Sequence, residues 1–507
     1  MHLEPEACHR ALDTHDPRFD GLFFVGISST GIYCRPVCPT RQTKRENRTF
    51  YPTAAAAEAA GYRPCLRCRP ELAPGRASVD AVNAWARAAV RRIEDGALGE
   101  MSLEELAKEL GISDRHLRRV VQSEYGVSPV ELAQTQKLLT AKRLLTDTDL
   151  PIGEVALASG FSSVRRFNAL FSERYNLTPT KLRKKGGSTG RDSIVCEVSY
   201  RPPLDWCGLL EFIAFRASCG VEAMDGSAYV RTVSIKGKSG WIRVTPDVPS
   251  TSSPTNPKVN TENLPHRNVL RVEISTSLAA VLPEVLVRVK RLFDLSAEPC
   301  AIAEALGDVC QDPAVRVPGA FDGFEIAVRA ILGQQVSVQA ASVISGKFAQ
   351  AFGEPIEAPY PQLNRIFPSP AIIAKLDPVK IAEVGIIRSR ANAIVSLAQA
   401  IVSKEIILRP GADAEATKAR LCEIPGIGPW TAEYVAMRAL AWPDAFPATD
   451  LGIKKAMANL PPFIGEVPRS EDGGVGAKSP SEKEILAMAE AWRPWRSYAA
   501  MHLWRSL

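Results

Sequence analysis

The sequence lacks any apolar run near the roughly 20 residues that a membrane-spanning helix requires. Its first residues, MHLEPEACHRALDTHD, also lack the basic and then apolar segments of a secretion signal. A strong excess of either charge is missing too: 62 Lys and Arg against 56 Asp and Glu leave +6, too little to identify a nucleic-acid-binding protein. We therefore expect a soluble cytoplasmic protein, whose 507 residues are too many for one compact core.

Cysteine is scarce, and its 11 copies cannot all pair with one another. Four of them form a C-x3-C pair and a C-x2-C pair with 26 residues between, namely Cys34, Cys38, Cys65 and Cys68. Such close pairs favour metal binding over disulfides. The other seven stand singly among apolar or mixed residues, and we expect small buried side chains without a chemical role: Cys8, Cys196, Cys207, Cys219, Cys300, Cys310 and Cys422.

Composition divides the chain into four regions, residues 1–75, 79–187, 194–310 and 311–507. The first is loop-rich and holds the cysteine pairs, and the second has a 3.6-residue apolar period and ends in a basic, Gly/Ser-containing linker. The third combines alternating stretches with a helical run near residues 282–293, which predicts an α+β domain, and the fourth is again helical. Residues 245–267 and 469–482, rich in Pro, Ser, Gly and charge, are typical of surface insertions.

The two cysteine pairs predict a tetrahedral zinc site of four thiolates, since each pair needs only a short turn to converge on one ion. One interpretation is a zinc ion that merely stabilises a small domain with little core. Basic residues around the thiols favour a second interpretation, a surface that attracts phosphate. These residues are Arg35, Arg41, Lys44, Arg45, Arg48, Arg63, Arg67 and Arg69.

A zinc-bound thiolate stays nucleophilic at neutral pH and can accept an alkyl group. The stretches GIYCRPVCPTR and ENRTFYPTAAAAEAAGYRPCLRC resemble the N-terminal domain of the Ada adaptive-response family. The resemblance implies that Cys34 takes a methyl group irreversibly from a DNA methylphosphotriester, while Cys38, Cys65 and Cys68 serve as ligands only. Methylation would remove one negative charge near the DNA, and we hypothesise a gain in affinity of tenfold or more, about 1.4 kcal/mol.

Two helix-turn-helix units are predicted in the second region. In the first, a capping box at residues 102–105 opens a helix, a turn follows at 111–113, and a second helix covers 114–124. After a joining helix at 129–145, the pattern recurs: a helix at 152–158, a turn at 159–161, and a helix capped by Ser162. Exposed polar residues on the two second helices could reach bases or phosphates: Arg115, Arg118, Arg119, Gln122, Arg165, Arg166 and Asn168.

Such a basic stripe could also be a merely solvated face. The segment PIGEVALASGFSSVRRFNALFSERYNLTPTKLRK, however, resembles the AraC-type regulator domain. That resemblance implies two units placed in successive major grooves.

A glycine turn between two helices marks the fourth region, at LCEIPGIGPWTAEY. Gly426 and Gly428 permit close backbone approach, and the N–H groups of the following helix could receive a phosphate. Alone this would be an ordinary turn, and Asp450 in FPATDLGIKK would be an ordinary N-cap. Together they resemble the helix-hairpin-helix DNA glycosylase superfamily, which implies that Asp450 is the catalytic carboxylate beside the deoxyribose of a flipped-out nucleotide.

Residues 195–507 resemble the AlkA family of 3-methyladenine glycosylases, in SYRPPLDWCGLLEF, VPGAFDGFEIAVRAILGQQVSV and AWRPWRSYAAMHLW. The resemblance implies that four aromatic residues line the pocket of the alkylated base: Phe212, Trp430, Tyr434 and Trp504. Each could instead be core, but electron-rich rings would attract a cationic purine. Gln335 stands where the family has a leucine wedge.

Two absences limit the expected reaction. Family members that also cut the strand have a lysine where this chain has Trp430, so we expect hydrolysis of the base alone. No cysteine follows Cys422, which argues against an iron–sulfur cluster. A Pro-Cys-His-Arg segment of the alkylguanine methyltransferases is also missing.

These observations predict a multidomain, mainly α protein with α+β parts: a zinc methyl-acceptor domain, a double helix-turn-helix, an AlkA-type α+β domain and a helix-hairpin-helix glycosylase domain. We expect a monomeric, nucleoid-associated sensor and activator that binds one zinc ion and double-stranded DNA, with RNA polymerase as a further partner. Two alternatives stay open. The N-terminal half could serve a glycosylase only as a DNA clamp, or the whole chain could be a regulator without enzymatic activity.

Overall fold

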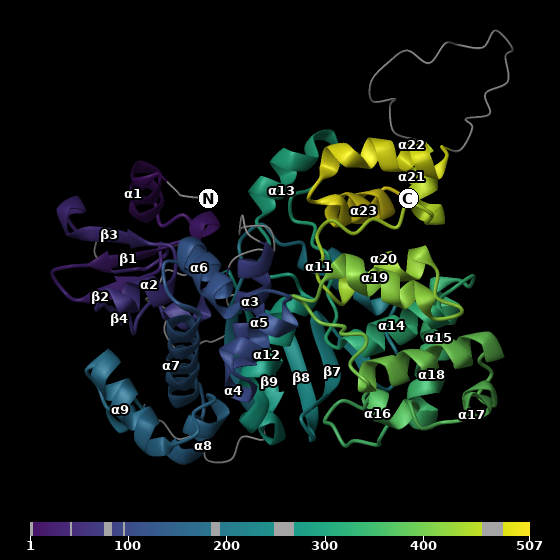
Figure 1. Cartoon of the computed structure of the whole chain (residues 1–507), viewed down its shortest axis with the longest axis horizontal. Coiled ribbons are helices and arrows are strands. Elements are labelled where there is room, and N and C mark those ends of the chain that lie inside the picture. The colour runs from purple at the N-terminus through teal and green to yellow at the C-terminus, as the bar shows by residue number, and fades with distance from the viewer. Residues whose placement is uncertain are drawn as a thin grey trace, which may run out of the picture.

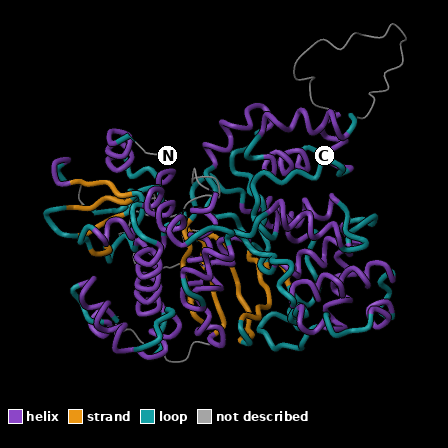
Figure 2. The backbone as a smooth tube through the Cα atoms, in the orientation of Figure 1, coloured by secondary structure: helices purple, strands orange, loops and turns teal. Residues whose placement is uncertain are grey.

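The computed structural model describes residues 4–40, 43–75, 84–94, 97–183, 193–247, 268–458 and 480–507. In Figure 1 the N-terminal regions lie on the left, a five-stranded sheet occupies the middle, and the C-terminal helices lie on the right. Figure 2 shows that strands are confined to two sheets. Among the described helices, none is long and apolar enough to cross a membrane.

The first region is a small four-stranded sheet of order β3-β1-β2-β4 with short helices around it. Its elements are α1 (Pro5–Asp13), β1 (Phe24–Ile27), β2 (Ile32–Cys34), β3 (Arg48–Tyr51), α2 (Ala54–Ala59) and β4 (Arg63–Pro64). The helix α2 begins at the N-cap Thr53, and its alanines bury one face against the sheet because small side chains allow close packing. The strands β2 and β4 are parallel neighbours, with Tyr33 opposite Pro64.

The second region contains the two predicted helix-turn-helix units. Its helices are α3 (Ala84–Glu94), α4 (Ala97–Glu100), α5 (Leu103–Glu109), α6 (Asp114–Tyr125), α7 (Pro129–Asp147), α8 (Ile152–Ala158), α9 (Val164–Tyr175) and α10 (Pro179–Leu182). The predicted capping box is confirmed, with Ser102 and Glu105 bonded to each other's backbone N–H groups. The predicted cap Ser162 is wrong by one residue: Ser163 accepts from the N–H of Arg166, three residues on, as an N-cap must.

The two helix-turn-helix units pack against different parts of the molecule. In the first unit, Leu117 shares an apolar cluster with Ala56 of α2. In the second unit, Phe167 of α9 shares a cluster with Val198 of β5 and Leu270 of β9 in the five-stranded sheet. The second unit is therefore built into the core of the α+β region.

The α+β region is an antiparallel sheet of order β5-β9-β8-β7-β6 with helices packed on it. Its elements are β5 (Ser193–Ser199), α11 (Trp206–Ala214), β6 (Glu222–Asp225), β7 (Ala228–Ile235), β8 (Lys238–Pro246), β9 (Val269–Ser275) and α12 (Leu282–Leu292). The alternating stretches and the helical run read from the sequence correspond to β7, β9 and α12. Most of the two predicted insertions, residues 248–267 and 469–479, lies outside the described residues.

The C-terminal helices form two apolar cores that meet along α20. These helices are α13 (Pro299–Leu306), α14 (Gly323–Leu332), α15 (Val338–Phe352), α16 (Pro370–Ile373), α17 (Pro378–Ala382), α18 (Arg388–Val402), α19 (Ala414–Glu423), α20 (Pro429–Arg438), α21 (Leu451–Ala458), α22 (Glu482–Ala489) and α23 (Arg496–Arg505). One core includes α14 and α18, and the other includes α21 and α23.

The sequence predicts that all seven single cysteines are buried, and this prediction is wrong for four of them. Cys8 and Cys196 are buried and Cys310 is half-buried, but Cys207, Cys219, Cys300 and Cys422 are exposed. The prediction failed because apolar neighbours in sequence do not share a helix face. The buried Trp206 directly precedes Cys207, and the next residue around the helix points to solvent.

Candidate functional site

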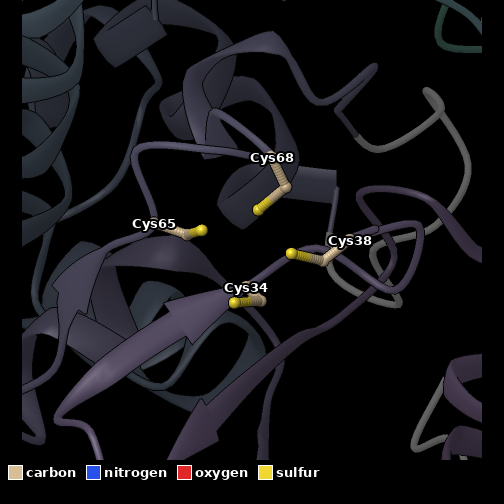
Figure 3. A group of neighbouring side chains, drawn as sticks. All are labelled: Cys34, Cys38, Cys65 and Cys68. Carbon is tan, nitrogen blue, oxygen red and sulfur yellow. The ribbon is translucent and has the colours of Figure 1, made fainter. Parts of the chain in front are cut away.

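The four cysteines of the two pairs converge at one point (Figure 3). All four are buried, and their sulfur atoms lie within 4.8 Å of one another. The convergence follows from the sheet: Cys34 and Cys65 directly follow the paired residues of β2 and β4, and each pair closes through a short turn. This donor set and spacing fit one tetrahedral zinc ion.

Outside the cluster itself, the four sulfurs differ in their hydrogen bonds. Cys68 accepts from the N–H of Arg35 at 3.4 Å, and Cys65 accepts from the N–H of Arg67 at 3.4 Å. Cys38 lies 3.2 Å from the Thr40 hydroxyl. Within the described residues, Cys34 has no such donor. A hydrogen bond to a thiolate spreads its negative charge and lowers its reactivity, so Cys34 is the sulfur with the least competition for its electrons.

Most of the basic residues near the thiols are occupied by ion pairs rather than turned to solvent. Arg35 is buried and bonded to Asp20, and its Nη2 also donates to Ser199 of β5 at 3.1 Å. Arg48 pairs with Asp13 at 2.7 Å, and Arg69 pairs with Glu71 and Asp147 at 3.0 and 2.6 Å. Arg45 pairs with Glu6 at 3.0 Å and Lys44 lies 3.6 Å from Glu46, although both stay exposed. Of these basic residues, only Arg63 and Arg67 have no ion pair within the described part of the chain, and Arg67 is exposed; Arg41 lies outside the described residues. The expected phosphate-attracting surface is therefore reduced.

The polar residues expected on the surface of the two second helices, α6 and α9, are all exposed there: Arg115, Arg118, Arg119, Gln122, Arg165, Arg166 and Asn168. Arg118 lies 3.1 Å from Asp114, one turn earlier on the same face, and Arg119 contacts His116. Both second helices therefore present a polar stripe to solvent.

The glycine turn between α19 and α20, with Gly426 and Gly428, is called the hairpin below. A cavity of about 1020 Å³ lies beside it, between the two C-terminal cores. Its wall includes Trp430, Tyr434, Asp450 and Trp504, which come from α20, the start of α21, and α23. The volume suits a flipped-out nucleotide. The structure thus brings four of the predicted residues to one wall, although they lie up to 74 positions apart in the sequence.

The carboxylate of Asp450 is held by three donors. Its Oδ2 accepts from Trp430 Nε1 at 2.8 Å, and its Oδ1 accepts from Trp504 Nε1 at 2.9 Å. The Oδ1 atom also accepts from the backbone N–H of Ile453 at 3.0 Å. The two interpretations of Asp450 are therefore compatible, because it caps α21 and faces the cavity at once.

The aromatic residues form a chain of ring contacts. Trp430 and Tyr434 are stacked with centroids 5.4 Å apart, and Tyr434 and Trp504 are 6.4 Å apart. Phe212 stacks with Trp504 at 6.5 Å but does not line the cavity. Instead the guanidinium of Arg216 lies 3.7 Å above the Phe212 ring, and Arg216 lines the cavity.

Sequence reasoning missed a group of arginines at the inner wall. Arg438 donates to the Tyr434 hydroxyl at 2.6 Å. Burial alone would raise the pKa of Tyr434, but the positive charges of Arg438, Arg216 and Arg329 lower it below its usual value. Arg438 follows Tyr434 by four residues on α20, and Arg216 follows Phe212 by four residues just past the end of α11. This spacing alone does not distinguish a buried pair from a solvated one.

The predicted wedge residue lies on the loop between α14 and α15. Gln335 is exposed, lines the cavity mouth and has a left-handed backbone with φ of 55°. The preceding residue, Gln334, donates to the carbonyl of Gly426 at 2.9 Å and to Thr431 at 3.0 Å, which ties this loop to the hairpin. Gly426 has φ of 94°, a value that favours glycine, and Gly428 faces open space.

Comparison with known families matches four models along the chain. They are the metal binding domain of Ada at residues 7–71, a helix-turn-helix domain at 106–185, the AlkA N-terminal domain at 195–322, and the HhH-GPD superfamily base excision DNA repair protein at 328–464. The order of these matches confirms the predicted combination of Ada-type, helix-turn-helix and AlkA-type parts.

Among curated relatives, the chain is 36% identical to the probable bifunctional transcriptional activator/DNA repair enzyme AlkA of Mycobacterium tuberculosis, with 100% of this chain and 97% of that protein covered. It is 32% identical to DNA-3-methyladenine glycosylase 2 of Escherichia coli, covering 61% of this chain and 95% of that protein. It is also 30% identical to the bifunctional transcriptional activator/DNA repair enzyme AdaA of Bacillus subtilis, covering 34% and 81%. The chain therefore belongs to the family of AlkA-type bifunctional transcriptional activator/DNA repair enzymes.

Proposed function

We propose that the C-terminal half hydrolyses the N-glycosidic bond of alkylated purines such as 3-methyladenine in double-stranded DNA. The observation that carries this proposal is the Asp450 carboxylate, which lines the cavity under the N–H groups of Trp430 and Trp504. As the bond breaks, positive charge grows on the deoxyribose. A fixed carboxylate stabilises that charge and orients the water that adds to C1′.

The aromatic wall supports a cationic alkylated base as substrate. The stacked rings of Trp430 and Tyr434 offer π faces that attract a positive purine. Trp504 extends this wall. Phe212 stacks with Trp504 but does not line the cavity, and the guanidinium of Arg216 covers its ring. Because Trp430 occupies the place of the lyase lysine, we propose base release without strand cleavage. Because no cysteine follows Cys422, we propose that this half holds no iron–sulfur cluster.

The exposed loop and hairpin support DNA binding beside the cavity. We propose that Gln335 enters the space that the flipped nucleotide leaves, since it stands at the mouth on a tethered loop. Gly426, Gly428 and the N-terminus of α20 then approach the phosphate backbone.

For the N-terminal half we propose suicidal methyl transfer to Cys34. A bound zinc ion would keep the four sulfurs as thiolates. Cys34 then attacks the methyl carbon of a methylphosphotriester: the C–S bond forms, the C–O bond breaks, and the phosphodiester leaves as an anion. Among the described residues, no donor outside the cluster bonds to Cys34, and this supports the choice of Cys34 over Cys38, Cys65 and Cys68.

The exposed stripes of α6 and α9 support binding of promoter DNA. We propose that this half acts as an alkylation sensor and activator, that the protein is a monomer, and that RNA polymerase is its further partner. We propose that the four functional domains are residues 1–75, 79–187, 194–310 and 311–507. A clamp role alone is the second candidate. Reporter expression after alkylation stress, measured with and without the Arg115, Arg118 and Arg119 side chains, separates the two.

The glycosylase is tested by incubating wild type and Asp450→Asn with methylated duplex DNA and measuring free 3-methyladenine and 7-methylguanine. The asparagine keeps the cap of α21, so the fold is retained. Asp413→Asn is the matched control, because Asp413 caps α19 through the N–H of Ala416 and lies outside the cavity wall. Equal release by wild type and Asp450→Asn would refute the role of Asp450.

A further inference from the structure

The inner wall of the cavity carries more positive than negative charge. Arg329 lines the cavity as Arg216 does, and it pairs with Glu222 at 2.6 Å and with Glu325 at 3.1 Å. Behind the wall, Arg231 pairs with Glu325 at 2.7 Å. All four of these side chains are at least 87% buried. Two arginines and two glutamates therefore neutralise one another, as buried charges must.

Two further arginines have no carboxylate partner among the described residues. Arg438 is buried, and it donates to the Tyr434 hydroxyl and to the carbonyl of Gly319 while its Nε has no partner. Arg216 donates through Nη1 to the carbonyl of Phe212 at 3.1 Å and rests on that ring. Only Arg216 of these two lines the cavity, together with Asp450.

Arg216 is held in place from both sides. Its guanidinium lies on the Phe212 ring, and its own carbonyl accepts a hydrogen bond from Arg329. Burial lowers the pKa of Arg216, but a guanidinium stays protonated under all ordinary conditions. A fixed cation without a carboxylate partner among the described residues therefore stands at the cavity wall, beside Tyr434.

Cationic and neutral bases differ in how such a cation changes the energy of the transition state relative to free enzyme and DNA. When a cationic alkylated purine leaves, the electron pair of the broken C1′–N bond neutralises it, so a nearby guanidinium opposes binding of the charged base and gives the nearly neutral leaving base no net stabilisation. When a neutral damaged purine leaves, the same electron pair makes the base an anion until water protonates it. A guanidinium stabilises that anion and can donate to a carbonyl on its edge.

We propose that Arg216 determines specificity by favouring neutral damaged purines with a carbonyl acceptor over cationic alkylated purines. This proposal rests on the proposed glycosylase function and goes beyond it. Asp450 serves the charge on the sugar in both reactions, whereas Arg216 serves only the charge on a neutral leaving base.

The test measures kcat/KM for base release, from single-turnover reactions at enzyme concentrations well below saturation, on duplexes that contain one deoxyinosine, a neutral carbonyl purine, or one 7-methyldeoxyguanosine, a cationic one. For Arg216→Met, which removes the charge but keeps an apolar side chain over Phe212, we expect the deoxyinosine to 7-methyldeoxyguanosine rate ratio to fall at least tenfold. Arg216→Lys keeps the charge and should stay within threefold of the wild-type ratio. Arg271→Met, at an exposed arginine of β9 outside the cavity wall, is the control.

A ratio that stays within threefold of wild type in Arg216→Met would overturn the proposal, whatever happens to the absolute rates. So would a wild-type protein that releases 7-methylguanine but no hypoxanthine. If wild type releases neither base, the proposed glycosylase function itself fails, and the role of Arg216 fails with it. Because the result is a ratio within one protein, partial loss of folded variant does not imitate it.

Discussion

The indole Nε1 of Trp430 lies 2.8 Å from Oδ2 of Asp450, so the hairpin helix and the next helix are joined by one side-chain hydrogen bond. Trp504 holds the other oxygen of the same carboxylate. The tryptophans therefore do more than offer a ring face to a base. They fix the direction in which the carboxylate points into the cavity.

Replacing Trp430 with phenylalanine separates these two roles. Phe keeps an aromatic face but removes the N–H donor, so the carboxylate loses one of its anchors. We expect base release to fall about tenfold or more, since a charge-assisted hydrogen bond is worth about 1.5–3 kcal/mol. Single-turnover kinetics on methylated DNA measure the effect.

The control for Trp430→Phe is Trp241→Phe, in a tryptophan of β8 that packs against Tyr360 away from the cavity. Retention of the full rate in Trp430→Phe would show that the indole N–H is dispensable.

A second prediction concerns Glu58. Its carboxyl is buried between the first region, residues 1–75, called the zinc region below, and the helix-turn-helix helices. It accepts from the hydroxyls of Tyr33, Thr135 and Tyr175 at 3.0, 2.9 and 3.4 Å, and Arg174 donates to its backbone carbonyl. Burial, the largest cause, raises its pKa from 4.5 to about 7. The folded protein therefore holds a proton that the unfolded chain releases above pH 4.5.

Proton linkage decides whether the free energy of unfolding rises or falls with pH. Between about pH 4.5 and 7 the folded state binds more protons, so the contribution of Glu58 to stability is lost as pH rises through this window. The full loss is on the order of 3 kcal/mol. Glu58→Gln removes the titration, and its stability advantage over wild type should grow from pH 5.5 to pH 8 in urea unfolding with zinc present. A constant difference across that range would contradict this account.

The local parts of the structure were predictable, because their signals are local. Ser102 with Glu105, and the turn at Gly111, mark the first helix-turn-helix through backbone hydrogen bonds within a few residues. Spacing likewise identified the metal cluster. The resemblance supplied both Asp450 and its aromatic neighbours. The structure brings Asp450, Trp430, Tyr434 and Trp504 to one cavity wall, and the catalytic role of Asp450 stays a prediction.

What could not be predicted depends on contacts between distant segments. That Phe167 packs with a strand of the α+β sheet, or that Arg35 is used to hold Asp20 instead of phosphate, has no signature in the neighbouring sequence. The arginines of the cavity wall were missed for a related reason. A basic residue one turn after an aromatic is typical of a solvated surface, and only the tertiary fold turns Arg216 and Arg438 inward.

A third prediction tests the choice of Cys34. Labelled methyl transfer from methylphosphotriester DNA should be lost in Cys34→Ala, because the sulfur without an external hydrogen bond is the proposed nucleophile. Cys422→Ala, at an exposed cysteine of α19, should transfer as wild type does. Label that persists in Cys34→Ala would assign the reaction to another sulfur.

The loss of one negative charge on methylation is tested with the same protein preparation. Methylated and unmethylated protein should differ at least tenfold in duplex affinity at low salt, and equal gel shifts would refute the hypothesis that this charge controls affinity.

The last prediction concerns Arg201, which joins the two halves of the molecule. Its guanidinium is buried and donates to backbone carbonyls on both sides: Asp20 at 3.1 Å and Gly75 in the zinc region, and Ser296 at 2.6 Å in the C-terminal half. Arg201→Met leaves these carbonyls without their donor at an interface closed to water. We expect a loss of about 3 kcal/mol in unfolding free energy.

Hydrogen exchange distinguishes this joint from a purely local role. In Arg201→Met, amides of residues 20–35 and of β5 should both exchange faster, because the two segments lose a shared anchor. Arg231→Met is the matched control: it also removes a buried arginine, but the hydrogen-bond partners of Arg231, namely Tyr229, Thr232 and Glu325, lie within the C-terminal half. Its effect should stay in that half. If residues 20–35 keep their wild-type exchange in Arg201→Met, then the contacts of Arg35 with Ser199 and the packing between the regions suffice to hold the zinc region in place, and Arg201 stabilises the C-terminal half alone.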